Sequence, residues 1–169
     1  MKWPRMGLEI VGALSLLLLL VGAVLIVYQG TDKVNRAKRD DALFILNYGG
    51  ITTNQDFKVI ASYESARSFT GDHLDYYCIE LPKFEIADYA KQGWHYGPEK
   101  DPLLVEALKL GVNDARAKND CFPSADEANS DAVQINFRSV TFHGQWPTAA
   151  DMILYEQKMN RLYYVSYKT

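Results

Sequence analysis

The sequence predicts an α+β protein: an N-terminal transmembrane helix followed by a small domain with a mainly antiparallel sheet of about five strands and helices on one face. Three observations predict it. A long apolar run lies near the N-terminus, apolar residues alternate in several later segments, and one segment has helical spacing behind a clear start signal. The length of 169 residues suits a single domain with an added helix.

The apolar run extends from Ile10 to Val27 and carries no charged side chain. As a helix rising roughly 1.5 Å per residue it would span about 27 Å, close to the hydrocarbon core of a bilayer. Trp3 precedes the run and Tyr28 follows it, as aromatic residues do at the headgroup level. A cleaved signal peptide would have a shorter apolar region. We therefore expect a retained anchor over residues 1–30 that contacts the lipid bilayer through residues 10–27.

The anchor is expected to continue as a juxtamembrane helix over residues 31–50. Leu43, Phe44 and Leu46 offer a partial apolar face, and Gly49-Gly50 provides a natural stop. The remaining residues, 51–169, are expected to form the globular α+β domain.

Alternating apolar residues predict the strands of this domain. Segments 57–63 and 73–81 have the period of strands, and Pro82 ends the second because proline cannot donate to a ladder. In segment 133–142 the apolar phase shifts near Arg138, which indicates a β-bulge. Segments 152–157 and 162–167 predict a hairpin joined through residues 158–161.

Two helices are expected between the second and third strands. Phe84 to Ala90 predict a short one. The longer one has Asp101 as its cap and Pro102 in its first turn, where the missing N–H costs nothing. Gly111 within it lowers helix stability by about 1 kcal/mol relative to alanine. Residues 93–98 and 119–131 are expected to be loops.

Two kinds of evidence on sidedness conflict. Basic residues after the run favour a cytoplasmic domain. The two cysteines, Cys78 and Cys121, favour the opposite side, because a disulfide between them would close a loop of about 44 residues and stabilise the domain by roughly 4 kcal/mol. We expect the disulfide, and with it a single-pass protein of the inner (cytoplasmic) membrane with an extracytoplasmic, periplasmic C-terminal domain. Two unpaired cysteines in a reducing compartment are the alternative.

No motif for catalysis or cofactor binding is found in the sequence. The net charge of −3 disfavours nucleic acid as a partner, because a phosphate-binding surface needs a dense basic patch. The three histidines lack the spacing of a zinc site, and there is no G-x-S-x-G, S-x-x-K or phosphate-binding loop. We therefore expect no catalytic residue, no metal and no small-molecule cofactor, and a protein that is not an enzyme.

Two segments are candidates for binding another molecule. The first is the loop between the first two strands, where Arg67, Phe69, Asp72 and His73 bring together a cation, an aromatic ring, an acid and an imidazole. A well-made turn is the alternative reading. The second is the segment 94–96, because tryptophan and tyrosine are enriched at protein interfaces. Its residues are Trp94, His95 and Tyr96, which could instead close over the edge of the core.

The N-terminal residues Met6-Gly7-Leu8-Glu9 resemble the processing region of type IV pilins and pseudopilins, which also join an apolar helix to an antiparallel sheet and often carry one disulfide. This resemblance implies a pilin-like subunit. The family pattern places the glutamate at the fifth residue after a glycine, whereas Glu9 is two residues after Gly7 and Pro4 stands at the glycine position.

The sequence thus favours a membrane-anchored, non-enzymatic domain that binds another envelope protein as an assembly factor, an inhibitor or an immunity-like partner. An envelope hydrolase with a dispersed site and a pilin-like subunit are the alternatives.

Overall fold

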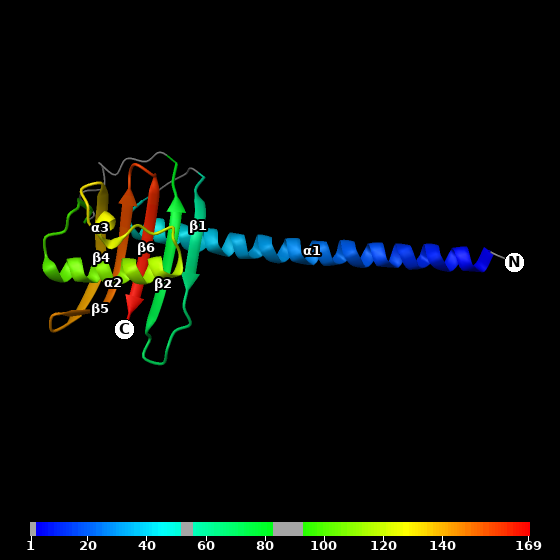
Figure 1. Ribbon diagram of the computed structural model, residues 1–169, viewed down its shortest axis with the longest axis horizontal. Helices are drawn as coiled ribbons and strands as arrows, with labels where there is room; N and C mark the ends of the chain where they lie inside the picture. The colour runs from blue at the N-terminus through cyan, green and yellow to red at the C-terminus, as the bar shows by residue number, and fades with distance from the viewer. Residues whose placement is uncertain (1–2, 52–55, 83–92) are drawn as a thin grey trace. The chain divides into compact units, whose positions relative to one another are not determined.

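The computed structural model describes the backbone of residues 3–51, 56–82 and 93–169, and within α1 it leaves out the side chains of residues 3–13 and 26–37 (Figure 1). The chain forms two compact units, Met1–Lys38 and Arg39–Thr169. The short helix expected over Phe84 to Ala90 lies outside the described residues.

Helix α1 (Trp3–Tyr48) contains the apolar run and continues to the predicted stop. Two glycines follow its last residue. The Gly49 N–H donates to the Ile45 carbonyl at 2.9 Å, and Gly50 has a φ of 75°, which glycine adopts at no steric cost. Across the described part of the chain, no helical stretch combines the length and the apolarity that crossing a bilayer requires.

The second unit is built on a six-stranded sheet in the order β1-β2-β6-β5-β4-β3. All neighbouring strands are antiparallel, which confirms the predicted sheet type. The strands are β1 (Lys58–Glu64), β2 (His73–Glu80), β3 (His95–Tyr96), β4 (Val133–His143), β5 (Trp146–Glu156) and β6 (Arg161–Lys168). About five strands were expected. The additional strand is β3, a two-residue edge strand in a segment that was expected to be a loop. Its shortness leaves no alternation that a sequence pattern could reveal.

Helix α2 (Pro102–Lys118) begins as predicted, with the Asp101 side chain accepting a hydrogen bond from the Leu103 N–H at 2.9 Å. A short helix, α3 (Ala125–Ala128), follows where a loop was expected. Its signal is a capping box, in which Ser124 and Glu127 each bond the backbone N–H of the other.

Helices cover both faces of the sheet, so the expectation of helices on one face is wrong. On one face, here called the α2 face, α2 packs over Cys78, Leu154 and Tyr163. On the opposite α1 face, the last turns of α1 pack through Leu46 and its neighbours over a second buried cluster that includes the strand residues Tyr77, Ile79, Ile153, Tyr155 and Leu162. The physical reason is that β2, β5 and β6 are apolar on both sides, and each side must be covered.

Two finer predictions are confirmed in the sheet. Cys78 in β2 and Cys121 after α2 lie at disulfide distance, with their Cα atoms 6.4 Å apart. The register of β4 with β5 shifts between Phe137 and Ser139, which places a bulge at Arg138.

Gly111 lies where α2 comes closest to the sheet. A Cβ atom at this position would lie 2.8 Å from Met152 Cε, 3.0 Å from Val165 Cγ1 and 3.1 Å from Tyr167 Cδ1. Met152 Cε is the end of a flexible side chain, but the valine methyl and the tyrosine ring are packed in the core. The glycine that weakens the helix locally therefore allows α2 to pack closely against β5 and β6.

We expect Gly111→Val to lower the free energy of unfolding by about 1–3 kcal/mol, because overpacking outweighs the gain in helix propensity. Urea unfolding monitored by circular dichroism measures this change. Asn113→Ala, on the exposed side of α2, is the control and should leave stability equal or slightly higher. A Gly111→Val variant as stable as the parent would show that α2 can move away from the sheet at no cost.

Candidate functional site

The loop between β1 and β2 is held in one conformation by its own side chains. The Thr70 hydroxyl donates to Asp72 Oδ2 at 2.5 Å, and the Asp72 N–H donates to Ser68 Oγ at 2.8 Å. Gly71, with a φ of 81°, donates its N–H to the Ser68 carbonyl at 3.0 Å. The hydrogen bond from Thr70 lowers the pKa of Asp72 below its usual value. An exposed loop is thus ordered before it meets any partner.

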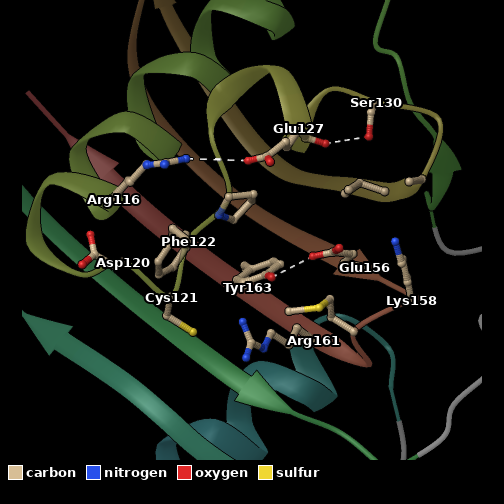
Figure 2. Close-up of a pocket in the computed structure, with 14 residues that line it drawn as sticks. Arg116, Asp120, Cys121, Phe122, Glu127, Ser130, Glu156, Lys158, Arg161 and Tyr163 are labelled. Carbon is tan, nitrogen blue, oxygen red and sulfur yellow. Dashed lines mark hydrogen bonds and ion pairs between the residues drawn. The ribbon is translucent and has the colours of Figure 1, made fainter.

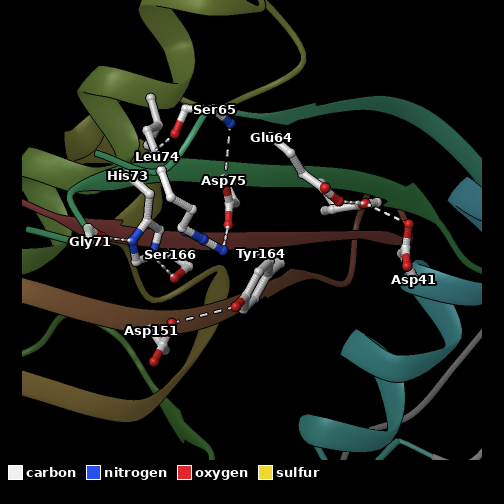
Figure 3. A network of polar contacts seen from close by, with 12 residues as sticks. Asp41, Glu64, Ser65, Gly71, His73, Leu74, Asp75, Asp151, Tyr164 and Ser166 are labelled. Atoms are coloured by element: carbon white, nitrogen blue, oxygen red, sulfur yellow. Dashed lines mark hydrogen bonds and ion pairs between the residues drawn. The ribbon is translucent and has the colours of Figure 1, made fainter. Parts of the chain in front are cut away.

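The side chains of Lys168 and His73 fasten this loop to the sheet, and Figure 3 shows the contacts of His73. Lys168 Nζ donates to the Thr70 carbonyl at 2.6 Å. The ring of His73 lies between the Gly71 carbonyl, 2.8 Å from Nδ1, and Ser166 Oγ, 3.0 Å from Nε2. The position of the loop is therefore set by β2 and β6.

Arg67 is bound to the sheet as well. Its guanidinium lies 2.6 Å from the carboxylate of Asp75, a residue only 8% exposed, and that carboxylate also accepts from the Ser65 N–H at 3.2 Å. A buried carboxylate needs such partners, because removal from water is costly for an unpaired charge. The interactions of Arg67 therefore serve the loop itself.

Phe69 differs from its neighbours in this loop. Its side chain is fully exposed, at 107% of the reference area, and no other large apolar side chain in the described part of the chain is more exposed. An aromatic ring held in water on an ordered loop loses little further entropy when it enters a pocket on another molecule.

A second exposed aromatic residue, Trp146, lies at the same end of the sheet. It opens β5 directly after the β4–β5 turn and is 69% exposed. The register pairs His73 with Lys168 and Lys168 with Ala149, so both hairpin tips project from one end. Sequence reasoning missed Trp146, although Gly144, with a φ of 64°, signalled a turn just before it.

The second predicted segment lies elsewhere and is partly structural. Strand β3 forms the edge of the sheet opposite β1, so the two candidate segments do not meet. Trp94 is 5% exposed, and its indole N–H donates to the Gly49 carbonyl at 3.0 Å. His95 Nε2 lies 2.9 Å from Glu99 Oε2, whereas Tyr96 is 62% exposed. Only Tyr96 of these three presents most of its side chain to solvent.

The contact between His73 and Ser166 has the form of a base beside a nucleophile, with the Gly71 carbonyl orienting the ring. Ser166, however, lies within the continuous strand β6 and is only 6% exposed, so a substrate cannot reach its hydroxyl. Among the described residues, no group of potential ligands could hold a metal ion. We assign the histidine–serine contact to loop positioning.

Burial raises the pKa of several tyrosine hydroxyls on the sheet. Burial raises the pKa of Tyr164 to about 12, and the nearby Asp151 carboxylate adds to the effect. Burial likewise raises the pKa of Tyr167 to about 12. The pKa of Tyr77 is raised by burial and by its hydrogen bond to Glu64.

These pKa values predict a loss of stability in alkali. A tyrosine whose folded pKa exceeds the unfolded value near 10 stabilises the fold below pH 10, and this contribution is lost as the pH rises toward 12. We expect the urea midpoint to fall between pH 10 and 12. We also expect Tyr164→Phe to remove a late step from the absorbance titration at about 295 nm. Tyrosines that all titrate near pH 10 in the folded protein would contradict this expectation.

No known protein family, no curated protein and no solved structure matches this chain.

Proposed function

We propose that this chain is a single-pass membrane protein whose domain, residues 39–169, binds another envelope protein through Phe69 and Trp146 and catalyses no reaction. The observation that carries the proposal is the pair of exposed aromatic side chains on two hairpin tips at one end of the sheet. Residues of this kind dominate the energy of protein interfaces, where aromatic anchors fill pockets on the partner.

The membrane anchor is supported by the exposed leucines of α1. Side chains are described for residues 14–25 of the run, and leucines throughout it are exposed, for example Leu16 at 63% and Leu19 at 72%. A helix that is apolar on all sides needs an apolar environment around its whole circumference. Lipid provides one, and the absence of charge from Ile10 to Val27 matches it.

The pairing of Cys78 with Cys121 supports a periplasmic position for the domain, because disulfides persist in oxidising compartments. We accordingly place the anchor in the inner membrane and the domain outside the cytoplasm. Alkaline phosphatase fused after Thr169 should be active, and a fluorescent protein that folds only in the cytoplasm should remain dark at the same position.

The spacing of the two aromatic tips fits a protein partner. The tips are separated by about three strand intervals, or roughly 14 Å at about 4.8 Å per interval. Both lie on ordered turns, so little conformational entropy is lost on binding. A surface of this width lies within one interface of standard size, which buries roughly 800 Å² on each side.

Photocrosslinking tests this function directly. Phe69 and, separately, Trp146 are replaced by benzoylphenylalanine in the full chain, and native membranes are irradiated. Tyr96, which is also exposed but lies at the β3 edge, is the matched control position. We expect the same protein adduct from positions 69 and 146, and none from position 96.

Two results would overturn the proposal. One is the absence of any adduct from positions 69 and 146 when the protein is folded and membrane-bound. The other is equal labelling from position 96, which would show non-specific crowding at the membrane. Should an adduct form, Phe69→Ala in the parent chain is expected to weaken capture of that protein by roughly 30-fold or more, the value of a central aromatic anchor.

A further inference from the structure

The end of β6 lies between the two hairpins that carry Phe69 and Trp146. The register pairs Lys168 with a residue of β2 on one side and with a residue of β5 on the other. Because β6 separates β2 from β5 in the sheet, contacts that fix one hairpin relative to the other must pass through it. Lys168 and Thr169 are therefore placed to contact both hairpins.

Lys168 reaches the β1–β2 loop at the residues directly after Phe69. Its ammonium donates to the Thr70 carbonyl at 2.6 Å, and a Cβ atom on Gly71 would lie 3.3 Å from Nζ. The pKa of Asp72 is lowered by its hydrogen bond from Thr70 and, to a smaller extent, by the positive charge of Lys168. A hydrogen bond from a charged donor is roughly twice as strong as a neutral one. One side chain thus acts on three consecutive residues of the loop.

The backbone next to Lys168 is bound to the other hairpin. The Thr169 N–H donates at 2.9 Å to the carbonyl of Thr148, which follows Trp146 closely in β5. The Thr148 hydroxyl in turn donates to the Thr141 carbonyl of β4 at 3.3 Å. These contacts connect the β1–β2 loop to the β4–β5 hairpin through two adjacent residues at the end of β6.

The other bonds between the loop and the sheet lie farther from Phe69 along the chain. Arg67 binds the Asp75 carboxylate on one side of the aromatic residue, and His73 binds the Gly71 carbonyl on the other. Of the loop–sheet bonds in the described part of the chain, only the one from Lys168 ends at a residue adjacent to Phe69. Loss of the ammonium should therefore leave the loop folded but release the position of the ring.

We propose that Lys168 is a positioning residue, through which the end of β6 holds Phe69 and Trp146 at one fixed spacing for a folded partner that has two apolar pockets at the same spacing. This inference rests on the proposed function, because it requires that both rings enter the partner. Two anchors held at the correct separation bind as one, since the second ring meets its pocket without a further search. A disordered peptide has no preformed pockets and would gain nothing from a fixed spacing.

Pulsed electron paramagnetic resonance measures this spacing without a partner. Residues 69 and 146 of the full chain are replaced by acetylphenylalanine, a nitroxide is coupled to each ketone, and the chain is studied in lipid nanodiscs. The label needs no free thiol, so the pairing of Cys78 with Cys121 is kept. We expect a single narrow distance distribution from the parent. It should be lost in Lys168→Met, which lacks the charge, and recovered in Lys168→Arg.

Lys158→Met is the matched control. Lys158 lies in the turn between β5 and β6, at the opposite end of β6, where it lines a cavity of about 490 Å³ (Figure 2). This variant should give the distribution of the parent, and the melting temperature shows that each variant is folded. A distribution in Lys168→Met as narrow as that of the parent overturns the proposal, and so does equal broadening in Lys158→Met.

Photocrosslinking from position 69 connects the spacing to binding. In Lys168→Met the yield of the adduct should fall by about fivefold, the equivalent of one ordinary hydrogen bond, and Lys168→Arg should retain it. An unchanged yield from a chain with broadened spacing would show that the partner does not need both rings at once. The absence of any adduct from the parent would instead refute the proposed function, whereas the resonance measurement alone decides whether Lys168 sets the spacing.

Discussion

Replacing Cys78 and Cys121 together by alanine is expected to lower the free energy of unfolding by about 4 kcal/mol. The two residues are 43 positions apart, and a crosslink closing a loop of this length removes that much conformational entropy from the unfolded chain in the loop-closure treatment. Cys78 is also fully buried in the α2-face core, so its loss affects packing as well. Urea unfolding of the solubilised chain measures the difference.

Adding a reductant distinguishes the contribution of the disulfide to stability from the contribution of side-chain packing. Reduction should destabilise the parent nearly as much as the double substitution does, and it should leave the double variant unchanged. A parent protein whose unfolding midpoint is the same with and without reductant would show that the pairing contributes nothing. That result would also remove the main support for a periplasmic domain.

Trp94→Ala is expected to destabilise the protein by about 3–5 kcal/mol, the usual cost of removing a buried tryptophan from a core. The ring is 5% exposed in the α1-face cluster, and its N–H donates to the Gly49 carbonyl directly after α1. This side chain therefore joins the end of α1 to the β3 edge. Thermal and urea unfolding of the full chain measure the effect.

Two further variants distinguish a structural role from a binding role for this segment. Trp94→Phe keeps most of the apolar area and loses the hydrogen bond, so it should cost only about 1–2 kcal/mol. Tyr96→Ala, on the exposed neighbour, should change stability by less than about 0.5 kcal/mol. A Trp94→Ala variant that unfolds like the parent but loses its partner would instead restore the role in binding that the sequence predicted.

Much of the fold was predictable because it follows from local patterns. The start of α2 at Asp101 and Pro102 and the bulge at Arg138 each depend on a few neighbouring residues. The hairpin of β5 and β6 follows in the same way from two alternating segments around a turn. The pairing of Cys78 with Cys121 was predictable because these are the only two cysteines.

The rest depends on which strands are neighbours, and a single sequence does not contain that order. The apolar residues on both faces of β2 require cover on both sides, but the helix that covers its second face is the end of α1. The partners of Asp75 and His73 come from positions that only the register of β2 with β6 brings together. Trp146 lies at the same end of the sheet as Phe69 for the same reason.

Alkaline extraction of membranes that contain the full chain tests the central claim most directly. A chain whose segment from Ile10 to Val27 spans the bilayer remains in the membrane pellet at about pH 11. Replacing Leu17 and Leu18 by lysine, at a cost of about 2.5–3.5 kcal/mol each, should move it to the supernatant. Phe44→Lys, an exposed position on the same helix but outside the run, should not. Release of the parent chain at this pH, or a purified protein that lacks these residues, would contradict a membrane-anchored binding domain.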